Sequence, residues 1–294
     1  MIIVTGAGGF IGSAMVSYLN SIGRKDIIAI DDLPHPDQFK NLVGKTFSIM
    51  SPNEIESITA FSPGDIQAVI HIGAISDTLA KDWPELYKKN VLSTRHWASI
   101  CNSWRIPMVF ASSAAVYGNG NGPLNQYAFS KQMSELEVSN RAACLRFFNV
   151  YGPNEYHKGR MASTILHWYN QIQETGSIKI FENSDSYLRD FIYVEDVCRV
   201  CWHFVENFKP GIYDVGTGVG VDFETVARKL ADEVKPDTYF NYIPMPEDLK
   251  NQYQTDTKAD VSALAGAGFP IDTLRTVQEG IEDYCEYLKG NYYL

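Results

Sequence analysis

Three residues of this chain have the types and spacing expected for proton transfer at a hydroxyl group. Tyr127 and Lys131 stand four positions apart in a segment predicted to be helical, so both side chains should lie on one face. Ser113 precedes them, just after the apolar run 108–111. A phenol with a pKa of about 10 is a weak base at neutral pH unless a neighbouring ammonium favours the phenolate. The set predicts an acid/base role for Tyr127, supported by Lys131, with Ser113 bonded to the reacting oxygen.

A glycine-rich turn follows the first apolar segment. Residues 1–5 predict a strand, residues 10–22 predict a helix, and Gly6, Gly9 and Gly12 fall at and after the turn between them. In a dinucleotide-binding turn the first glycine permits the bend, the second lets backbone approach a pyrophosphate, and the third lets helix and strand pack closely. Unpaired amides at the helix start then face the phosphates. The turn therefore predicts a bound dinucleotide.

The end of the second predicted strand indicates which dinucleotide binds. The apolar run 27–30 ends at Asp31, where a carboxylate is expected to accept a hydrogen bond from a ribose hydroxyl. Asp32 adds a second carboxylate, which would repel a 2′-phosphate, whereas Lys40 nearby would attract one. We expect NAD rather than NADP, with NADP as the alternative.

Alternating strands and helices are predicted to position these groups. Apolar runs at 46–49, 68–72, 108–111 and 143–147 predict further strands, and residues 84–104 and 126–140 predict helices between them. This alternation favours an α/β fold with a doubly wound parallel sheet (Rossmann), which binds ligands at the carboxyl ends of its strands. The second half predicts a smaller α/β substrate-binding lid domain. We expect residues 1–152 and 188–217 to form the dinucleotide-binding domain, and 153–187 and 218–294 the substrate domain.

Composition argues against several classes of function. The chain has 294 residues, 45% of them apolar, and a formal net charge of -10. An acidic chain is poorly suited to nucleic acid or an anionic membrane surface, and no apolar run approaches the roughly 20 residues of a membrane span. The first predicted strand begins at Met1, which leaves no room for a signal peptide. A cytoplasmic protein without nucleic-acid or membrane partners is expected.

The cysteines and one strand histidine are predicted to be structural. Five cysteines without a spaced framework fit a reducing compartment. Cys198 and Cys201 form a CxxC pair, but no second pair completes a zinc site, so no metal is expected. His71 lies in the predicted strand 68–72 and is expected to be a packed histidine rather than a base.

The order of the motifs resembles that of the extended short-chain dehydrogenase/reductase family, in its nucleotide-sugar branch. The matching segments are the turn from Gly6 to Gly12 and residues 113–118, 127–131, 148–153 and 189–197. Within that branch, residues 156–163, 213–218 and 243–254 most resemble the epimerases that act on ADP-linked heptoses. The likeness spans nearly the whole chain.

The resemblance implies a role for many residues. Tyr127 and Lys158 would be the two acid/base residues, with Lys131 and Ser113 in support. The cofactor, NAD or NADP, would be lined by Gly6, Gly9, Phe10, Ile11, Gly12, Asp31, Asp32, Ile72, Gly73, Ala74, Ile75, Ser76, Asn90, Lys131, Val150 and Lys158. The nucleotide-sugar substrate would be held by Asn149, Arg160, His167, Phe181, Glu182, Asn183, Ser184, Arg189 and Tyr253.

The reaction that the resemblance implies is epimerisation of an ADP-heptose by transient oxidation and reduction, with the cofactor regenerated at each turnover. Such an enzyme oxidises one epimer and reduces the ketone from its other face, so two acid/base groups make chemical sense. The resemblance also implies a part in lipopolysaccharide biosynthesis, and a homo-oligomer is expected.

Two departures from the family pattern bear on the substrate. The connection between Ser113 and Tyr127 is short and contains the glycine-rich segment 118–123, next to the expected sugar pocket. Val219 stands where the family often carries a basic residue. The identity of the sugar and the binding of the nucleotide end are therefore open.

Other functions remain possible from the motifs alone. Another nucleotide-sugar enzyme, such as a UDP-hexose 4-epimerase, is the first alternative; Ala114 and Ala115 lack the acidic pair of a dehydratase. A non-catalytic NAD(P)-binding protein is the second, although such proteins typically lose the tyrosine or the lysine. Taken singly, Lys158 could be a solvated loop residue, and Arg189 could simply pair with a nearby aspartate.

Overall fold

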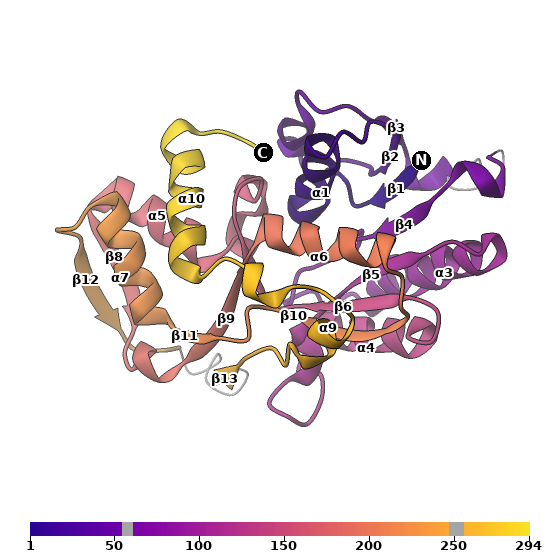
Figure 1. Cartoon of the computed structure of the whole chain (residues 1–294). Coiled ribbons are helices and arrows are strands. Elements are labelled where there is room, and N and C mark those ends of the chain that lie inside the picture. The colour runs from indigo at the N-terminus through magenta and orange to yellow at the C-terminus, as the bar shows by residue number, and fades with distance from the viewer. Residues whose placement is uncertain (55–60, 247–255) are drawn as a thin grey trace.

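A seven-stranded parallel sheet forms the centre of the larger half of the molecule (Figure 1). In a computed structural model of the chain, which describes residues 1–54, 61–246 and 256–294, its strands run in the order β3-β2-β1-β4-β5-β6-β10. They are β1 (Ile2–Thr5), β2 (Ile27–Ile30), β3 (Ser48–Met50), β4 (Ala68–His71), β5 (Met108–Ser113), β6 (Ala143–Phe147) and β10 (Gly211–Val215). The order reverses between β1 and β4, which is where such sheets bind ligands. The predicted doubly wound sheet is confirmed.

Helices cover both faces of this sheet. The helices α1 (Phe10–Ser21) and α6 (Val194–Glu206) pack on one face, and α3 (Ser93–Trp104) and α4 (Gln126–Val138) pack on the other. Successive side chains of a strand point to opposite faces. Ile2 and Val4 therefore join the core beneath α1 and α6, whereas Ile3 joins the core beneath α3 and α4. Burial on both faces explains why these strands are continuously apolar.

The helical stretch before β5 contains an irregular turn. It begins with α2 (Trp83–Leu86), whose first turn is capped by the Asp82 carboxylate accepting from the Glu85 amide at 3.2 Å. A π-helical turn (Tyr87–Leu92) follows and leads directly into α3. Such turns occur often at functional sites. Asn90 lies in this turn and is almost completely buried.

The smaller half has its own sheets and its own core (Figure 1). The strand β9 (Leu188–Tyr193) pairs with β7 (Asn149–Tyr151), β11 (Gly220–Asp222) and β13 (Asp256–Thr257), and β8 (Ser177–Phe181) pairs with β12 (Tyr239–Ile243). The helices α5 (Thr164–Thr175), α7 (Phe223–Val234) and α10 (Val277–Gly290) pack around a second core. The short helix α9 (Ser262–Gly266) packs instead on the core of the large sheet, through Leu264. Asp222 caps α7 by accepting from the Thr225 amide at 2.7 Å.

The cysteines are free and buried, and they include Cys198 and Cys201 on α6. Within the described ranges, no cluster of three or more potential metal ligands is present. In those same ranges, none of the helices has the length and apolar character needed to cross a bilayer.

Candidate active site

The glycine-rich turn between β1 and α1 is closed tightly against the loop after β4. Gly6 has a φ of +66°, and a Cβ on it would lie 2.6 Å from the Gly73 Cα. A Cβ on Gly12 would lie only 1.9 Å from the Gly6 carbonyl oxygen. Neither position can therefore carry a side chain without moving backbone. The turn is shaped for the close packing expected of a dinucleotide site.

The start of α1 leaves amide groups available to an anion. Gly9 is the N-cap, its own amide donates to the Gly6 carbonyl at 3.1 Å, and no described side chain caps the helix. The first turn also carries no acidic residue. Free amides and the positive end of the helix dipole favour a phosphate at this place. The turn therefore fits a dinucleotide pyrophosphate.

The two carboxylates after β2 lie beside the same turn. Asp31 accepts hydrogen bonds from the Gly8 amide at 2.9 Å and from the Leu33 amide at 2.7 Å. These bonds fix its carboxylate next to the glycine-rich turn. Asp32 accepts a hydrogen bond from the Ser51 hydroxyl at 2.8 Å. Lys40, the base that could favour a 2′-phosphate, forms an ion pair with Asp37 at 2.7 Å. This arrangement suits a free ribose hydroxyl better than a phosphate.

Tyr127 and Ser113 meet at the carboxyl end of β5. Tyr127 lies in the first turn of α4, a helix that Asn125 caps by accepting from the Ala128 amide at 2.8 Å. Tyr127 is 9% exposed, and the Ser113 side chain is near enough to its hydroxyl to influence its pKa. Burial raises the pKa of Tyr127, and the neighbouring Ser113 hydroxyl only partly opposes that effect. The phenol is therefore a protonated group, ready to donate.

Lys131 is buried one turn further along α4. Its Nζ donates to the Ala111 carbonyl at 2.8 Å and lies 5.0 Å from the centre of the Phe110 ring. Burial lowers the pKa of Lys131 to about 7, although Glu135 acts in the opposite direction. The sequence predicted an ammonium that favours a Tyr127 phenolate. The structure differs, because the ammonium is directed at a carbonyl and desolvation governs the pKa of both residues.

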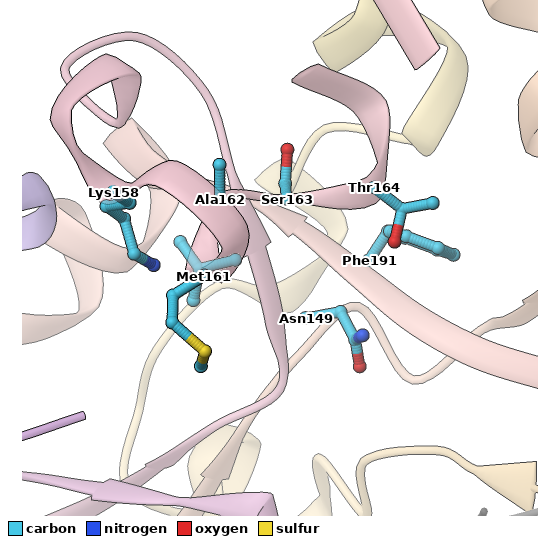
Figure 2. A pocket seen from close by; sticks show the side chains of 8 residues that line it. Asn149, Lys158, Met161, Ala162, Ser163, Thr164 and Phe191 are labelled. Atoms are coloured by element: carbon cyan, nitrogen blue, oxygen red, sulfur yellow. The ribbon is translucent and has the colours of Figure 1, made fainter. Parts of the chain in front are cut away.

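A cavity of about 200 Å³ lies between the strands β7 and β9 and the segment 158–164 (Figure 2). Asn149 reaches it from β7, and Lys158 reaches it from the helical turn Tyr156–Met161. Neither Tyr127 nor Ser113 is part of its wall. The residues that line it are Asn149, Val150, Lys158, Met161, Ala162, Ser163, Thr164 and Phe191.

Lys158 is held where it could exchange a proton. Its Nζ lies 5.1 Å from the centre of the Phe10 ring, at the start of α1, so it links the pocket with the glycine-rich turn. Burial lowers the pKa of Lys158, while the charge of Glu155 raises it. A lysine in this setting is not the solvated loop residue that its isolated sequence position allowed.

Glu155 is a feature of the site that sequence reasoning missed. Its side chain is fully buried and accepts hydrogen bonds from the Ser163 hydroxyl at 2.6 Å, the Tyr284 hydroxyl at 3.2 Å and the Gly152 amide at 3.3 Å. Burial raises the pKa of Glu155, and the charge of Lys158 opposes the shift. The carboxylate ties down the loop that carries Lys158. Glu155 stands three residues before Lys158 in the sequence, and this spacing could have indicated that its carboxylate acts on the lysine.

The loop after β4 is held by Asn90. The Asn90 Oδ1 accepts from the Ile75 amide at 2.8 Å, and its Nδ2 donates to the Ile75 carbonyl at 3.0 Å and to the Ser130 Oγ at 2.8 Å. Both amide hydrogens are therefore used within the protein. Asn90 fixes residues 72–76, the expected cofactor wall, through the backbone of Ile75.

The residues expected around the sugar and nucleotide are dispersed. Arg160 is 63% exposed at its side chain and forms an ion pair with Asp77 at 2.5 Å, and the His167 ring lies 3.4 Å from the Arg160 carbonyl oxygen. Phe181, Glu182, Asn183 and Ser184 lie at the end of β8 and in the turn that follows, where Asn183 has a φ of +59°. Tyr253 lies outside the described residues.

Arg189 is largely buried at the start of β9. It donates to the Leu188 carbonyl at 2.8 Å and lies 5.4 Å from the centre of the Phe223 ring. Two neighbouring carboxylates are held by other donors. Asp190 accepts from the Thr217 and Gly218 amides and from the Ala259 amide, while Asp196 pairs with Arg199 and Arg275. The turn after β10 is thereby fixed next to Arg189.

Comparisons with known proteins agree with this geometry. A model of the NAD dependent epimerase/dehydratase family matches residues 2–216. The chain is 40% identical, over 98% of each sequence, to an ADP-L-glycero-D-manno-heptose-6-epimerase of Brachyspira hyodysenteriae. The crystal structure of the Helicobacter pylori ADP-L-glycero-D-manno-heptose-6-epimerase matches with a TM-score of 0.84 and 25% identity, over 98% of this chain and 96% of that one. MoeE5 in complex with UDP-glucuronic acid and NAD matches with a TM-score of 0.79 and 26% identity, over 99% of each chain. This chain belongs to the NAD dependent epimerase/dehydratase family.

Proposed function

We propose that this protein converts ADP-D-glycero-D-manno-heptose into ADP-L-glycero-D-manno-heptose. The observation that carries the proposal is the 40% identity to an ADP-L-glycero-D-manno-heptose-6-epimerase over 98% of both chains. The site supports it, because a tyrosine beside a serine and a desolvated lysine in a pocket wall supply two acid/base groups. NAD, when bound, supplies hydride acceptance from the substrate carbon and hydride return to its opposite face.

Tyr127 and Ser113 would act on one side of the substrate oxygen. In our proposal the Ser113 hydroxyl orients that oxygen. Tyr127 first releases its own proton to solvent, and as the phenolate it accepts the proton of the alcohol as the alcohol becomes a ketone. The buried phenol resists losing its proton, so Lys131 must assist by turning from the Ala111 carbonyl toward the cofactor ribose and the phenol. Burial helps, because a charge interaction is stronger away from water.

Lys158 would act on the same oxygen from the other side. An epimerase must return a proton after the ketone has presented its opposite face, and a second group spares the first from moving. Burial brings the pKa of Lys158 down from its ordinary value, toward the range where it exchanges a proton readily. Asn149 stands on the facing wall of the pocket and would bind the sugar (Figure 2).

We assign the remaining site residues by the same reasoning. The cofactor would lie along the glycine-rich turn, Asp31, Asp32, residues 72–76, Lys131 and Val150, with Asn90 holding the wall. The substrate would be bound by Asn149, Arg160, His167, residues 181–184, Arg189 and Tyr253. The tight turn, its uncapped amides and the fixed Asp31 carboxylate support the cofactor part of this assignment.

A panel of nucleotide sugars tests the activity. The purified protein should interconvert the two ADP-heptose epimers and incorporate no solvent deuterium at the inverted carbon, because the hydride is returned rather than exchanged. Chromatography separates the epimers, and mass spectrometry measures the deuterium. Interconversion of UDP-glucose and UDP-galactose, with ADP-heptose untouched, would refute the substrate assignment.

We further propose that the chain divides into two domains, residues 1–152 with 188–217 and residues 153–187 with 218–294. Separate apolar cores, one around α1 and α6 and the other around α5, α7 and α10, support a division into two units. The cores place the boundary elsewhere for three short elements, because Tyr151 of β7 and Phe191 of β9 join the second core and Leu264 of α9 joins the first. Asn149 and Lys158 would then face each other from different domains across the pocket. Limited proteolysis with and without a nucleotide sugar tests the division.

We also propose a homo-oligomer in the cytoplasm. Leu92, Phe129 and Leu136 are 39%, 43% and 74% exposed on the neighbouring helical segments before β5 and in α4. Exposed apolar side chains on adjoining helices favour association, and the free cysteines fit a reducing compartment. A molar mass equal to that of one chain by light scattering would contradict the oligomer.

A further inference from the structure

A buried chain of hydrogen bonds runs through His71 at the end of β4. The His71 Nδ1 lies 2.7 Å from the Thr5 Oγ1, and its Nε2 lies 3.1 Å from the Thr94 Oγ1. The Gly73 amide donates to the Thr5 Oγ1 at 3.0 Å, and the Thr94 hydroxyl donates to the Asn90 carbonyl at 2.6 Å. Thr5, His71 and Thr94 are at most 4% exposed. The chain therefore joins four separate elements away from water.

The donors and acceptors in this chain of hydrogen bonds allow only one arrangement of hydrogen atoms. Thr94 uses its only hydroxyl hydrogen on the Asn90 carbonyl, so it must accept from the His71 Nε2. The neutral ring then has a bare Nδ1, which accepts the Thr5 hydrogen. The Thr5 oxygen is left to accept from Gly73. His71 is therefore the Nε2–H tautomer, and all four hydrogen bonds point in one direction, from the Gly73 amide to the Asn90 carbonyl.

The Asn90 end of this hydrogen-bond chain reaches α4, the helix that carries Tyr127. Asn90 clamps both backbone groups of Ile75 and donates to the Ser130 hydroxyl at 2.8 Å. Ser130 in turn donates to the Tyr127 carbonyl at 2.7 Å. Gly73 and Ile75 belong to the expected cofactor wall, and Tyr127 begins α4. Both wall positions are thus tied, through Asn90 and His71, to the helix that carries the acid/base tyrosine.

We propose that His71 is a positioning residue for the reaction, which holds the cofactor wall at Gly73 in register with Asn90 and the Tyr127 helix. The proposal rests on the function proposed above, because it assigns His71 to the same site. The site needs its hydride acceptor and its proton acceptor at matched positions, and small displacements reduce such a reaction strongly. A rigid chain between the wall and α4 supplies that match.

The surroundings keep the His71 ring neutral, so the same ring nitrogen donates and the same ring nitrogen accepts throughout. His71 is stacked on Phe110, with ring centres 5.9 Å apart, and it lies 6.4 Å from the ring centre of Trp97. Burial, with a smaller effect from the charge of Lys131, lowers the pKa of His71 to about 3. The hydrogen-bond direction is therefore independent of pH across the working range.

Nitrogen NMR of the histidine rings tests the arrangement without any substrate. In the full chain labelled with ¹⁵N-histidine, the His71 signals, identified by their loss in His71→Asn, should be those of a neutral Nε2–H ring from pH 5 to pH 8. Thr94→Val removes the acceptor of that hydrogen and should change the tautomer. An Nδ1–H ring in the unmodified protein, or protonation within this range, would overturn the proposal.

A double-mutant cycle tests the function of the chain. Thr5→Val and Thr94→Val remove one hydroxyl each at nearly constant shape, and each should lower kcat or NAD affinity about tenfold, the usual scale for a broken buried hydrogen bond. The double variant should lose no more than the worse single variant, because both changes break one connected unit. Thr238→Val is the matched control, since that buried hydroxyl donates to the Lys235 carbonyl at 2.6 Å elsewhere in the fold.

Each outcome of the cycle decides the question. Losses in kcat and NAD affinity that add in the double variant, or that match those of the Thr238→Val control, would show only a structural role and overturn the proposal. NAD affinity and the tautomer are measured without a sugar. A protein that fails to epimerise ADP-heptose but shows the non-additive NAD affinities would therefore refute the substrate assignment and leave the positioning role intact.

Discussion

Replacing the buried Lys131 with methionine should stabilise the folded protein while lowering its activity. Burial brings the pKa of Lys131 from 10.5 to about 7, and at about 1.4 kcal/mol per pKa unit this sets an upper limit of about 5 kcal/mol on the penalty at pH 7. Methionine keeps the bulk but leaves the Ala111 carbonyl without its donor, which costs about 1–2 kcal/mol. The expected net gain in the free energy of unfolding is about 3 kcal/mol.

The pH dependence of that gain is the sharper test. Between pH 7 and pH 10.5 the unfolded chain keeps a proton on Lys131 that the folded chain has released. The wild-type free energy of unfolding should therefore rise with pH through this window, by at most about 1.4 kcal/mol per pH unit from this group. The Lys131→Met variant lacks that contribution, so its advantage over the wild type should shrink from pH 7 to pH 9.

Urea unfolding at pH 7, 8 and 9 measures the effect. Dinucleotide-free protein is needed, because bound cofactor adds its own stabilisation. Lys179→Met, at an exposed position on β8, is the matched control and should change the free energy of unfolding little. A Lys131→Met variant that is less stable than the wild type at pH 7, or whose advantage stays constant with pH, would refute the reasoning.

Four further changes test the site. Tyr127→Phe should lower turnover at least ~10²-fold with an unchanged melting temperature, because only the proton-carrying hydroxyl is lost; near-normal turnover would exclude Tyr127 as the acid/base group. Lys158→Met should have a loss of similar size, and retained epimerisation would favour a single-base mechanism. Gly12→Ala should abolish NAD retention, measured as the dinucleotide released from the denatured, desalted protein, since its Cβ would lie 1.9 Å from the Gly6 oxygen; retained NAD would contradict this reading of the turn. Glu155→Gln removes the charge that raises the pKa of Lys158, so the alkaline limb of the pH–rate profile should move to lower pH; an unmoved limb would separate Glu155 from Lys158.

The fold could be predicted from the sequence because its causes are local and repeated. The apolar runs at Ile2–Thr5, Ile27–Ile30 and Ala68–His71 are buried on both faces, and that burial is what makes a parallel strand continuously apolar. The glycine-rich turn could also be predicted, since the clash that excludes a side chain at Gly12 involves backbone only six residues away.

The rest of the site depends on contacts that no local pattern encodes. Glu155 is anchored by Tyr284, which is 129 residues further along the chain. The direction of the Lys131 amine is set by Ala111 on a neighbouring strand, 20 residues away. The threonines that fix the His71 tautomer lie 66 and 23 residues from it. Spacing can place these residues near a site, but only the packed structure shows which atoms they meet.

The buried cysteines give the protein an unexpected practical property. Burial raises the pKa of Cys101, Cys144 and Cys201 to about 12, and all five thiols are enclosed. Maleimide and iodoacetamide dyes react with accessible thiolates, so the folded wild-type protein should not be labelled by them. A cysteine introduced at a surface position would then be the only thiol that the dye labels. Dye pairs placed on α5 and α1 could report, in single molecules, whether the lid and the cofactor lobe approach each other when a nucleotide sugar arrives.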